Sequence, residues 1–85
     1  MSYWVYVIKG ESTGRYYVRS TGDLPDRIRR HNANRSAATR NRGPWRVVYT
    51  EEFISRQEAA NRERAIKAQK SRAYVERLVR AARVG

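Results

Sequence analysis

No cysteine occurs among the 85 residues of this chain, so neither a disulfide nor a thiolate-bound metal can hold it folded. A chain of this length has room for one modest hydrophobic core, and a hydrophobic fraction of 40% suits such a core. We therefore expect residues 1–85 to form a single domain. Any metal must be bound by oxygen ligands or by His31, the one histidine, which favours magnesium or manganese over zinc.

Positive charge dominates the composition. Nineteen basic residues, sixteen of them arginine, face eight acidic residues and give a net charge of +11. Arginine suits bidentate phosphate contacts, so a nucleic acid is the expected partner. Basicity reports affinity and not catalysis, so a binding protein and an enzyme both fit. No run of residues is long and apolar enough for a membrane span or a signal sequence, and we expect a cytoplasmic protein without a membrane partner.

Residue patterns predict six secondary-structure elements. Two β-rich runs joined by a glycine-flanked turn predict a hairpin, and helix-start signals follow at Asp23 and again at Ser55. The expected strands are Tyr3–Lys9, Arg15–Ser20 and Trp45–Phe53, and the expected helices run from Asp23 to about Asn32, Ser55 to about Lys70 and Ser71 to about Arg83. The prediction is an α+β (α/β) fold, with a small antiparallel three-stranded sheet flanked by helices in the order β-β-α-β-α-α. The neighbour of the third strand stays open.

Strict alternation along the third strand places four large apolar side chains on one face of the sheet. These residues are Trp45, Val47, Tyr49 and Phe53. The segment between this strand and the first helix is rich in Asn, Ser, Arg, Thr and Gly, and we expect a loop there.

A carboxylate lies on the apolar side of the second expected helix. Glu63 shares helical spacing with Ala59, Ile66 and Lys70, and these positions should pack on the sheet. A carboxylate in that position must be paired, hydrogen-bonded or bound to a cation. A salt bridge with an arginine and a metal site both satisfy this requirement.

Other polar groups border the expected core. In the first helix Arg27 and His31, spaced i, i+4, lie beside the apolar stripe, and Arg27 could simply pair with Glu63. Tyr6 and Tyr17 stand in paired strands, so their hydroxyls can converge on one face. Each residue alone has a structural explanation. Together they supply a proton acceptor, cationic phosphate ligands and a metal carboxylate, which phosphodiester hydrolysis requires.

Five stretches in order resemble the GIY-YIG nuclease domain, closest to its stand-alone bacterial branch. They are W-V-Y-V-I-K, Y-Y-V-R-S-T-G-D-L, D-R-I-R-R-H-N, P-W-R-V-V-Y-T-E-E-F and A-A-N-R-E-R-A-I-K, and they cover nearly the whole chain. The resemblance implies the GIY-YIG endonuclease fold. It also implies a metal on Glu63 and catalytic residues at Tyr6, Tyr17, Arg27, His31 and Tyr49.

The resemblance implies an activity as well: metal-dependent hydrolysis of DNA by water, with one Mg²⁺ or Mn²⁺ ion. One tyrosine would act as the base or orient it, and the choice between Tyr6 and Tyr17 stays open. Nothing predicts a base-reading helix, so we expect single-stranded or branched DNA with little sequence specificity, cut by a monomer or weak homodimer. The residues expected to contact the nucleic acid are Arg19, Arg35, Arg40, Arg42 and Lys70.

Two departures from the family pattern affect the expected activity. Arg19 replaces the glycine of the second motif and by alternation shares a face with Tyr17, so it could block the scissile phosphate or add a contact to it. The late asparagine of some relatives has no clear counterpart, and Lys70 is the candidate substitute. A catalytically impaired nucleic-acid-binding domain is therefore the alternative function. An RNA-directed role fits the charge but has no sequence feature of its own.

Overall fold

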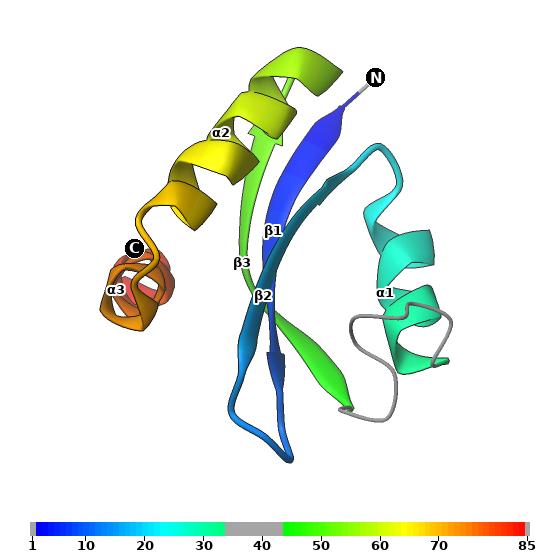
Figure 1. Ribbon diagram of the computed structural model, residues 1–85. Coiled ribbons are helices and arrows are strands. Elements are labelled where there is room, and N and C mark those ends of the chain that lie inside the picture. Colours follow the sequence, from blue (N-terminus) through cyan, green and yellow to red (C-terminus); the bar gives the residue numbers. More distant parts are fainter. Residues whose placement is uncertain (1, 34–43, 85) are drawn as a thin grey trace.

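The computed structural model describes residues 2–33 and 44–84. The elements are β1 (Tyr3–Gly10), β2 (Tyr16–Thr21), α1 (Leu24–Asn32), β3 (Trp45–Phe53), α2 (Arg56–Ala68) and α3 (Arg72–Val84), as Figure 1 shows. The strands lie in the order β2-β1-β3, and both pairs are antiparallel. The predicted order of elements and the α+β architecture are confirmed, and β1 is now identified as the neighbour of β3.

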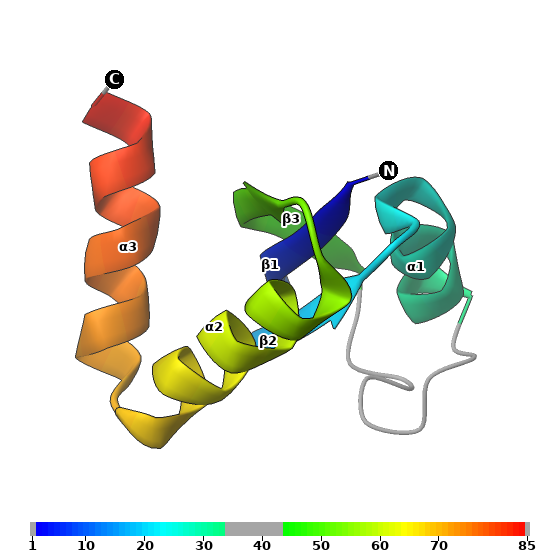
Figure 2. The same ribbon diagram turned by 90° about the horizontal axis from the view of Figure 1, so that it is seen from above.

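β1 is the central strand and is covered on both faces, so four consecutive residues, Val5 to Ile8, are all buried. Figure 2 shows the sheet between α1 on one side and α2 with α3 on the other. The α2–α3 face packs Val5 and Val7 against Ala59, Ile66, Val75 and Val79. The α1 face packs Tyr6 and Ile8 against Trp45, with Leu24, Ile28, Val47 and Tyr17 around them.

Side-chain caps begin α1 and α2 where the sequence predicts. The Asp23 carboxylate accepts a hydrogen bond from the backbone N–H of Asp26 at 3.1 Å. The Ser55 hydroxyl accepts one from the N–H of Glu58 at 3.1 Å. Each cap satisfies an N–H that the first helical turn leaves without a partner, so both helices start at defined positions relative to the sheet.

The prediction that four side chains of β3 share one face is wrong. Val7 of β1 pairs with Tyr49, whereas the next residue, Ile8, pairs with Val47, so Val48 is an extra residue in the ladder. Such a bulge shifts the two-residue alternation. Trp45 and Val47 consequently lie on the α1 face, and Tyr49 and Phe53 lie on the α2–α3 face.

The second helix is shorter than predicted. α2 ends at Ala68, and Lys70 has a left-handed backbone with φ of 48°. Lys70 therefore lies in the turn to α3 and does not extend the helical face of Ala59, Glu63 and Ile66. The chain turns there because α3 packs its buried residue Val75 against the same core cluster as Ile66.

We predict that Ile66→Ala lowers the free energy of unfolding by about 2–5 kcal/mol, because Ile66 is 2% exposed and its removal leaves a cavity. Ile54 is the matched control, since it is 85% exposed, and Ile54→Ala should change stability by less than about 0.5 kcal/mol. Urea unfolding followed by circular dichroism measures both. Equal losses for the two variants would contradict the packing described above.

Candidate functional site

A buried hydrogen bond joins the sheet to the first helix. The hydroxyl of Tyr6 in β1 and Nε2 of His31 in α1 are 2.9 Å apart, and the two rings are tilted by 58°. Tyr6 is 0% exposed and His31 is 2% exposed. The two groups therefore share a proton away from bulk water.

Burial sets the protonation of this pair. It raises the pKa of Tyr6 to about 12, although the nearby charges of Arg27 and Arg19 act in the opposite direction. It also lowers the pKa of His31, and the positive charges of Arg19 and Arg27 lower it further. At neutral pH both groups are uncharged, so Nε2 of His31 can accept a proton from the Tyr6 hydroxyl.

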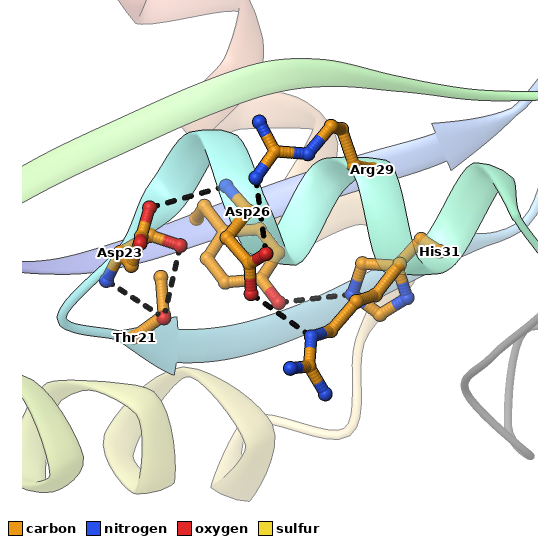
Figure 3. Close-up of polar contacts among 7 residues, drawn as sticks. Thr21, Asp23, Asp26, Arg29 and His31 are labelled. Carbon is orange, nitrogen blue, oxygen red and sulfur yellow. Dashed lines mark hydrogen bonds and ion pairs between the residues drawn. The ribbon is translucent and has the colours of Figure 1, made fainter.

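Contacts at both ends of α1 hold His31 in place. At the start, the Thr21 hydroxyl accepts from the N–H of Asp23 at 3.0 Å, next to the Asp23 cap, as Figure 3 shows. At the end, Asn32 accepts from the N–H of Trp45 at 2.6 Å and donates to the carbonyl of Trp45 at 3.2 Å. These contacts tie α1 to β2 and to β3.

Asp26 organises the outer side of the same helix. It forms ion pairs with Arg29 at 3.0 Å and with Arg30 at 2.9 Å, one turn further along α1. In Figure 3 these contacts lie beside the helix, whereas His31 reaches toward the strands. Exposed pairs of this kind add little stability.

Arg19 lies at the centre of the charged groups. It is directly opposite Tyr6 in the β1–β2 ladder, so both side chains are on the α1 face. Its charge lowers the pKa values of Tyr6, His31 and Glu63. Arg19, which replaces the motif glycine, therefore interacts electrostatically with three residues that the sequence predicts to be in the site.

Arg27 is exposed and borders a small cavity of about 150 Å³ at the end of β2. Ser20 and Arg56 also line the cavity. Arg56, the first residue of α2, places its guanidinium over the ring of Tyr3, 5.5 Å from the ring centroid. Two guanidinium groups thus flank a space that can hold an anion.

Glu63 approaches the same strand from the other face of the sheet. Its carboxylate accepts from the Ser20 hydroxyl at 2.6 Å and pairs with Lys67 at 2.5 Å. Burial acts to raise the pKa of Glu63, but the hydrogen bonds from Lys67 and Ser20 outweigh it, so the pKa is lowered and the group is ionised. The structural explanation that Arg27 pairs with Glu63 is wrong, since Lys67 takes that place.

Charges on the two faces of the sheet act on one another. The negative charge of Glu63 acts on Tyr6, and the positive charge of Arg19 acts on Glu63. The structure therefore brings together five nominated groups. They are Tyr6, Arg19, Arg27, His31 and Glu63.

The carboxylate oxygens of Glu63 are suitable ligands for a magnesium ion that binds together with the substrate. Within residues 2–33 and 44–84 no three His, Asp or Glu side chains are grouped as a metal cluster. Magnesium is often held by one carboxylate with phosphate and water as its other ligands. The side chain of Lys67 is 42% exposed and can move aside to release the carboxylate.

Two nominated tyrosines lie away from the Tyr6–His31 pair. Tyr17 is half-buried on the same face and packs edge-on against Trp45, with ring centroids 5.1 Å apart. The structure does not bring Tyr49 to the site, because its pairing with Val7 places it on the α2–α3 face. There its hydroxyl donates to Glu51, which also pairs with Arg62 at 3.0 Å.

Four other residues were predicted to contact the nucleic acid. Lys70 lies in the α2–α3 turn, and three arginines lie outside the described residues: Arg35, Arg40 and Arg42. Ser20 and Lys67 are partners of Glu63 that the sequence did not predict. The spacing of Glu63 and Lys67, i and i+4 on one helix, was a visible signal for the second of these.

Residues 2–76 match the family described as the GIY-YIG catalytic domain, and the chain belongs to this family. Its relatives include a UPF0213 protein of Halobacterium salinarum, which is 47% identical over 75 residues, 87% of this chain and 95% of the relative. The UPF0213 protein BH0048 of Halalkalibacterium halodurans is 38% identical over 68 residues, covering 79% and 71%.

A solved structure agrees with the fold. The solution NMR structure of BH0048, from Bacillus halodurans, has a TM-score of 0.59 to this chain at 35% identity. The match covers 95% of this chain and 85% of that one. Family membership supports a nuclease-type activity. Among the described residues, no helix has the length and apolar character needed to span a membrane.

We predict that Arg19→Gln raises the pKa of His31, because it removes a positive charge that disfavours the imidazolium. Because the pKa of His31 in the folded protein is below its ordinary value of 6.5, the fold is most stable above pH 6.5. This contribution to stability is lost as the pH falls through the folded pKa. An NMR titration of the imidazole measures the shift. Arg64→Gln, on the exposed side of α2, is the control and should leave the titration unchanged.

Proposed function

We propose that this protein is a metal-dependent endonuclease that hydrolyses DNA phosphodiester bonds. The observation that carries the proposal is the buried Tyr6–His31 hydrogen bond, with Arg27, Arg19 and the ionised Glu63 around it at the edge of β2. A proton acceptor, two cations and one carboxylate in this arrangement match the requirements of phosphodiester hydrolysis.

The Tyr6–His31 pair serves as the base in this proposal. The Tyr6 phenol is protonated at neutral pH and needs an acceptor before it can take a proton from water. His31 is neutral and its Nε2 lies 2.9 Å away, so it can receive the phenolic proton as Tyr6 receives one from water. This assigns the base to Tyr6 and leaves Tyr17 to shape the surface next to it.

Arg27 and Arg19 hold the negative charge of the reacting phosphate. Arg27 borders the cavity shared with Ser20 and Arg56, which has room for a phosphate group. A guanidinium can contact two phosphate oxygens at once, and its charge stabilises a phosphorane more than the ground state. Arg19 adds charge next to Tyr6 and Glu63.

Glu63 is the proposed metal ligand, and the Ser20 hydroxyl orients it. When bound, a magnesium or manganese ion would supply Lewis-acid charge at the phosphate. During hydrolysis the oxygen of water forms a bond to phosphorus, and the bond from phosphorus to the 3′ oxygen breaks. The 3′ oxygen takes a proton from solvent, which leaves 5′-phosphate and 3′-hydroxyl ends.

The proposed substrate is single-stranded or branched DNA, recognised with little sequence specificity. The net charge of +11 supports a polyanionic substrate, and the exposed Arg27 and half-buried Arg19 offer two cations beside the buried Tyr6–His31 pair. We propose a monomer or weak homodimer that acts in the cytoplasm.

A second candidate function rests on Arg19. Its side chain interacts with Tyr6, His31 and Glu63, where the family motif has no side chain at all. A long cation among these groups can occupy the place of the substrate or of the metal. The protein would then bind nucleic acid without cutting it.

Glu63→Ala should reduce magnesium- or manganese-dependent nicking to about one hundredth of the parent rate or less, because it removes the only proposed metal ligand. Labelled single-strand, duplex and forked oligonucleotides, with and without EDTA, provide the assay. Glu58→Ala is the matched control on the exposed side of the same helix and should cut normally. Unchanged cutting by Glu63→Ala would show that the metal assignment is wrong.

Arg19→Gly separates the two candidate functions, since it restores the motif glycine. If the parent is an impaired nuclease, the variant should gain cutting by about tenfold or more, because the groups around Tyr6 become accessible to phosphate. If Arg19 contacts the phosphate productively, the variant should cut more slowly. Rates measured on the same oligonucleotides under single-turnover conditions distinguish these results.

A further inference from the structure

A cavity of about 440 Å³ lies outside the Tyr6–His31 pair, where β2 meets the turn between α2 and α3. This volume is in the range of pockets that bind small organic groups such as a nucleobase. The mouth is lined by four cations, Arg15, Lys67, Lys70 and Arg72, and the lining contains no carboxylate.

The four cations differ in whether a carboxylate neutralises them. Lys67 pairs with Glu63 and Arg72 pairs with Glu76. In the described part of the chain, neither Arg15 nor Lys70 forms an ion pair. Their positive charge at the mouth is therefore uncompensated and suits the phosphates of a polyanion.

The floor of the cavity is apolar. Val18, Ile66 and Val75 belong to the buried core, and each contributes to the lining. Tyr16, which packs against the same core cluster, lies at the wall and offers an aromatic surface. An apolar floor beneath a cationic rim suits an unpaired base with its flanking phosphates, because bases contact apolar and aromatic groups while phosphates contact cations.

The backbone of Lys70 points to the same use. It is the one non-glycine residue with positive φ in the described ranges, at 48°. Glycine adopts this conformation without steric cost, whereas a lysine does not. The left-handed turn that ends α2 therefore places an unpaired positive charge in the lining of the cavity.

The cavity adjoins the proposed site through Lys67, which lines it and also pairs with Glu63 one helical turn earlier. We propose that the cavity binds one unpaired nucleotide of single-stranded DNA, with its base on the apolar floor and its phosphates at Arg15 and Lys70. This inference rests on the proposed function and specifies its substrate. A duplex cannot present a base in this way without unpairing it.

Binding in EDTA tests the cavity without cleavage. The probe is a fluorescent single-stranded DNA 12-mer, compared with the same 12-mer lacking its bases and with a hairpin duplex, by anisotropy across a salt series. We expect the abasic strand and the duplex each to bind at least about fivefold more weakly than the intact strand. A ribonucleotide strand that binds more tightly than the DNA strand would overturn the DNA assignment.

Lys70→Gly is the informative variant, because it removes the charge and relieves the backbone strain. Single-strand affinity should fall about fivefold, and the slope of log affinity against log salt should flatten by about 0.7, as for one lost phosphate contact. The melting temperature should not fall, which excludes unfolding as the cause. Arg64→Ala removes the same charge from α2 outside the cavity, and should weaken binding less than twofold.

Equal losses of affinity for Lys70→Gly and Arg64→Ala would contradict nucleotide binding in the cavity. Full affinity for the abasic strand would contradict it as well. These results are independent of catalysis. If no variant cuts DNA in any divalent metal while the binding differences persist, the cavity stands and the nuclease proposal fails. If the parent cuts DNA and the binding differences are absent, the nuclease proposal stands and nucleotide binding in the cavity is contradicted.

Discussion

Burial of β1 on both faces is the constraint on which the rest of the structure depends. A strand with helices against each face has no solvent for its polar side chains, so the phenol of Tyr6 needs a partner inside the protein. His31 is that partner, and it can reach Tyr6 only because α1 is tied to the sheet at both ends. The fold and the candidate site therefore share one cause.

The location of the site at the edge of β2 follows from the strand order. α1 covers one face of the sheet and α2 covers the other, so groups carried by the two helices would normally be separated by the sheet. At the outer strand that separation ends. Tyr6 and Arg19 from one face, and Glu63 from the other, come within electrostatic reach there.

Local signals in the sequence were sufficient for most of the fold. The caps at Asp23 and Ser55 act through hydrogen bonds over three residues, so the sequence alone places both helix starts. The bulge at Val48 and the left-handed turn at Lys70 were missed, because both depend on packing between elements that are distant in sequence. The bulge puts Trp45 and Val47 on the opposite face from Tyr49, which alternation along the sequence does not reveal. For the same reason Ser20 as the partner of Glu63 was not foreseeable, since the contact joins a strand and a helix that are 43 residues apart in the sequence.

The two hydrogen bonds between Asn32 and Trp45 have an evolutionary consequence. They fasten the end of α1 to the first residue of β3 and so fix both ends of the intervening segment independently of what lies between them. Closure entropy grows only slowly with loop length, so added residues there cost little. Homologous chains can therefore tolerate insertions or deletions at this point while the imidazole keeps its place against the central strand.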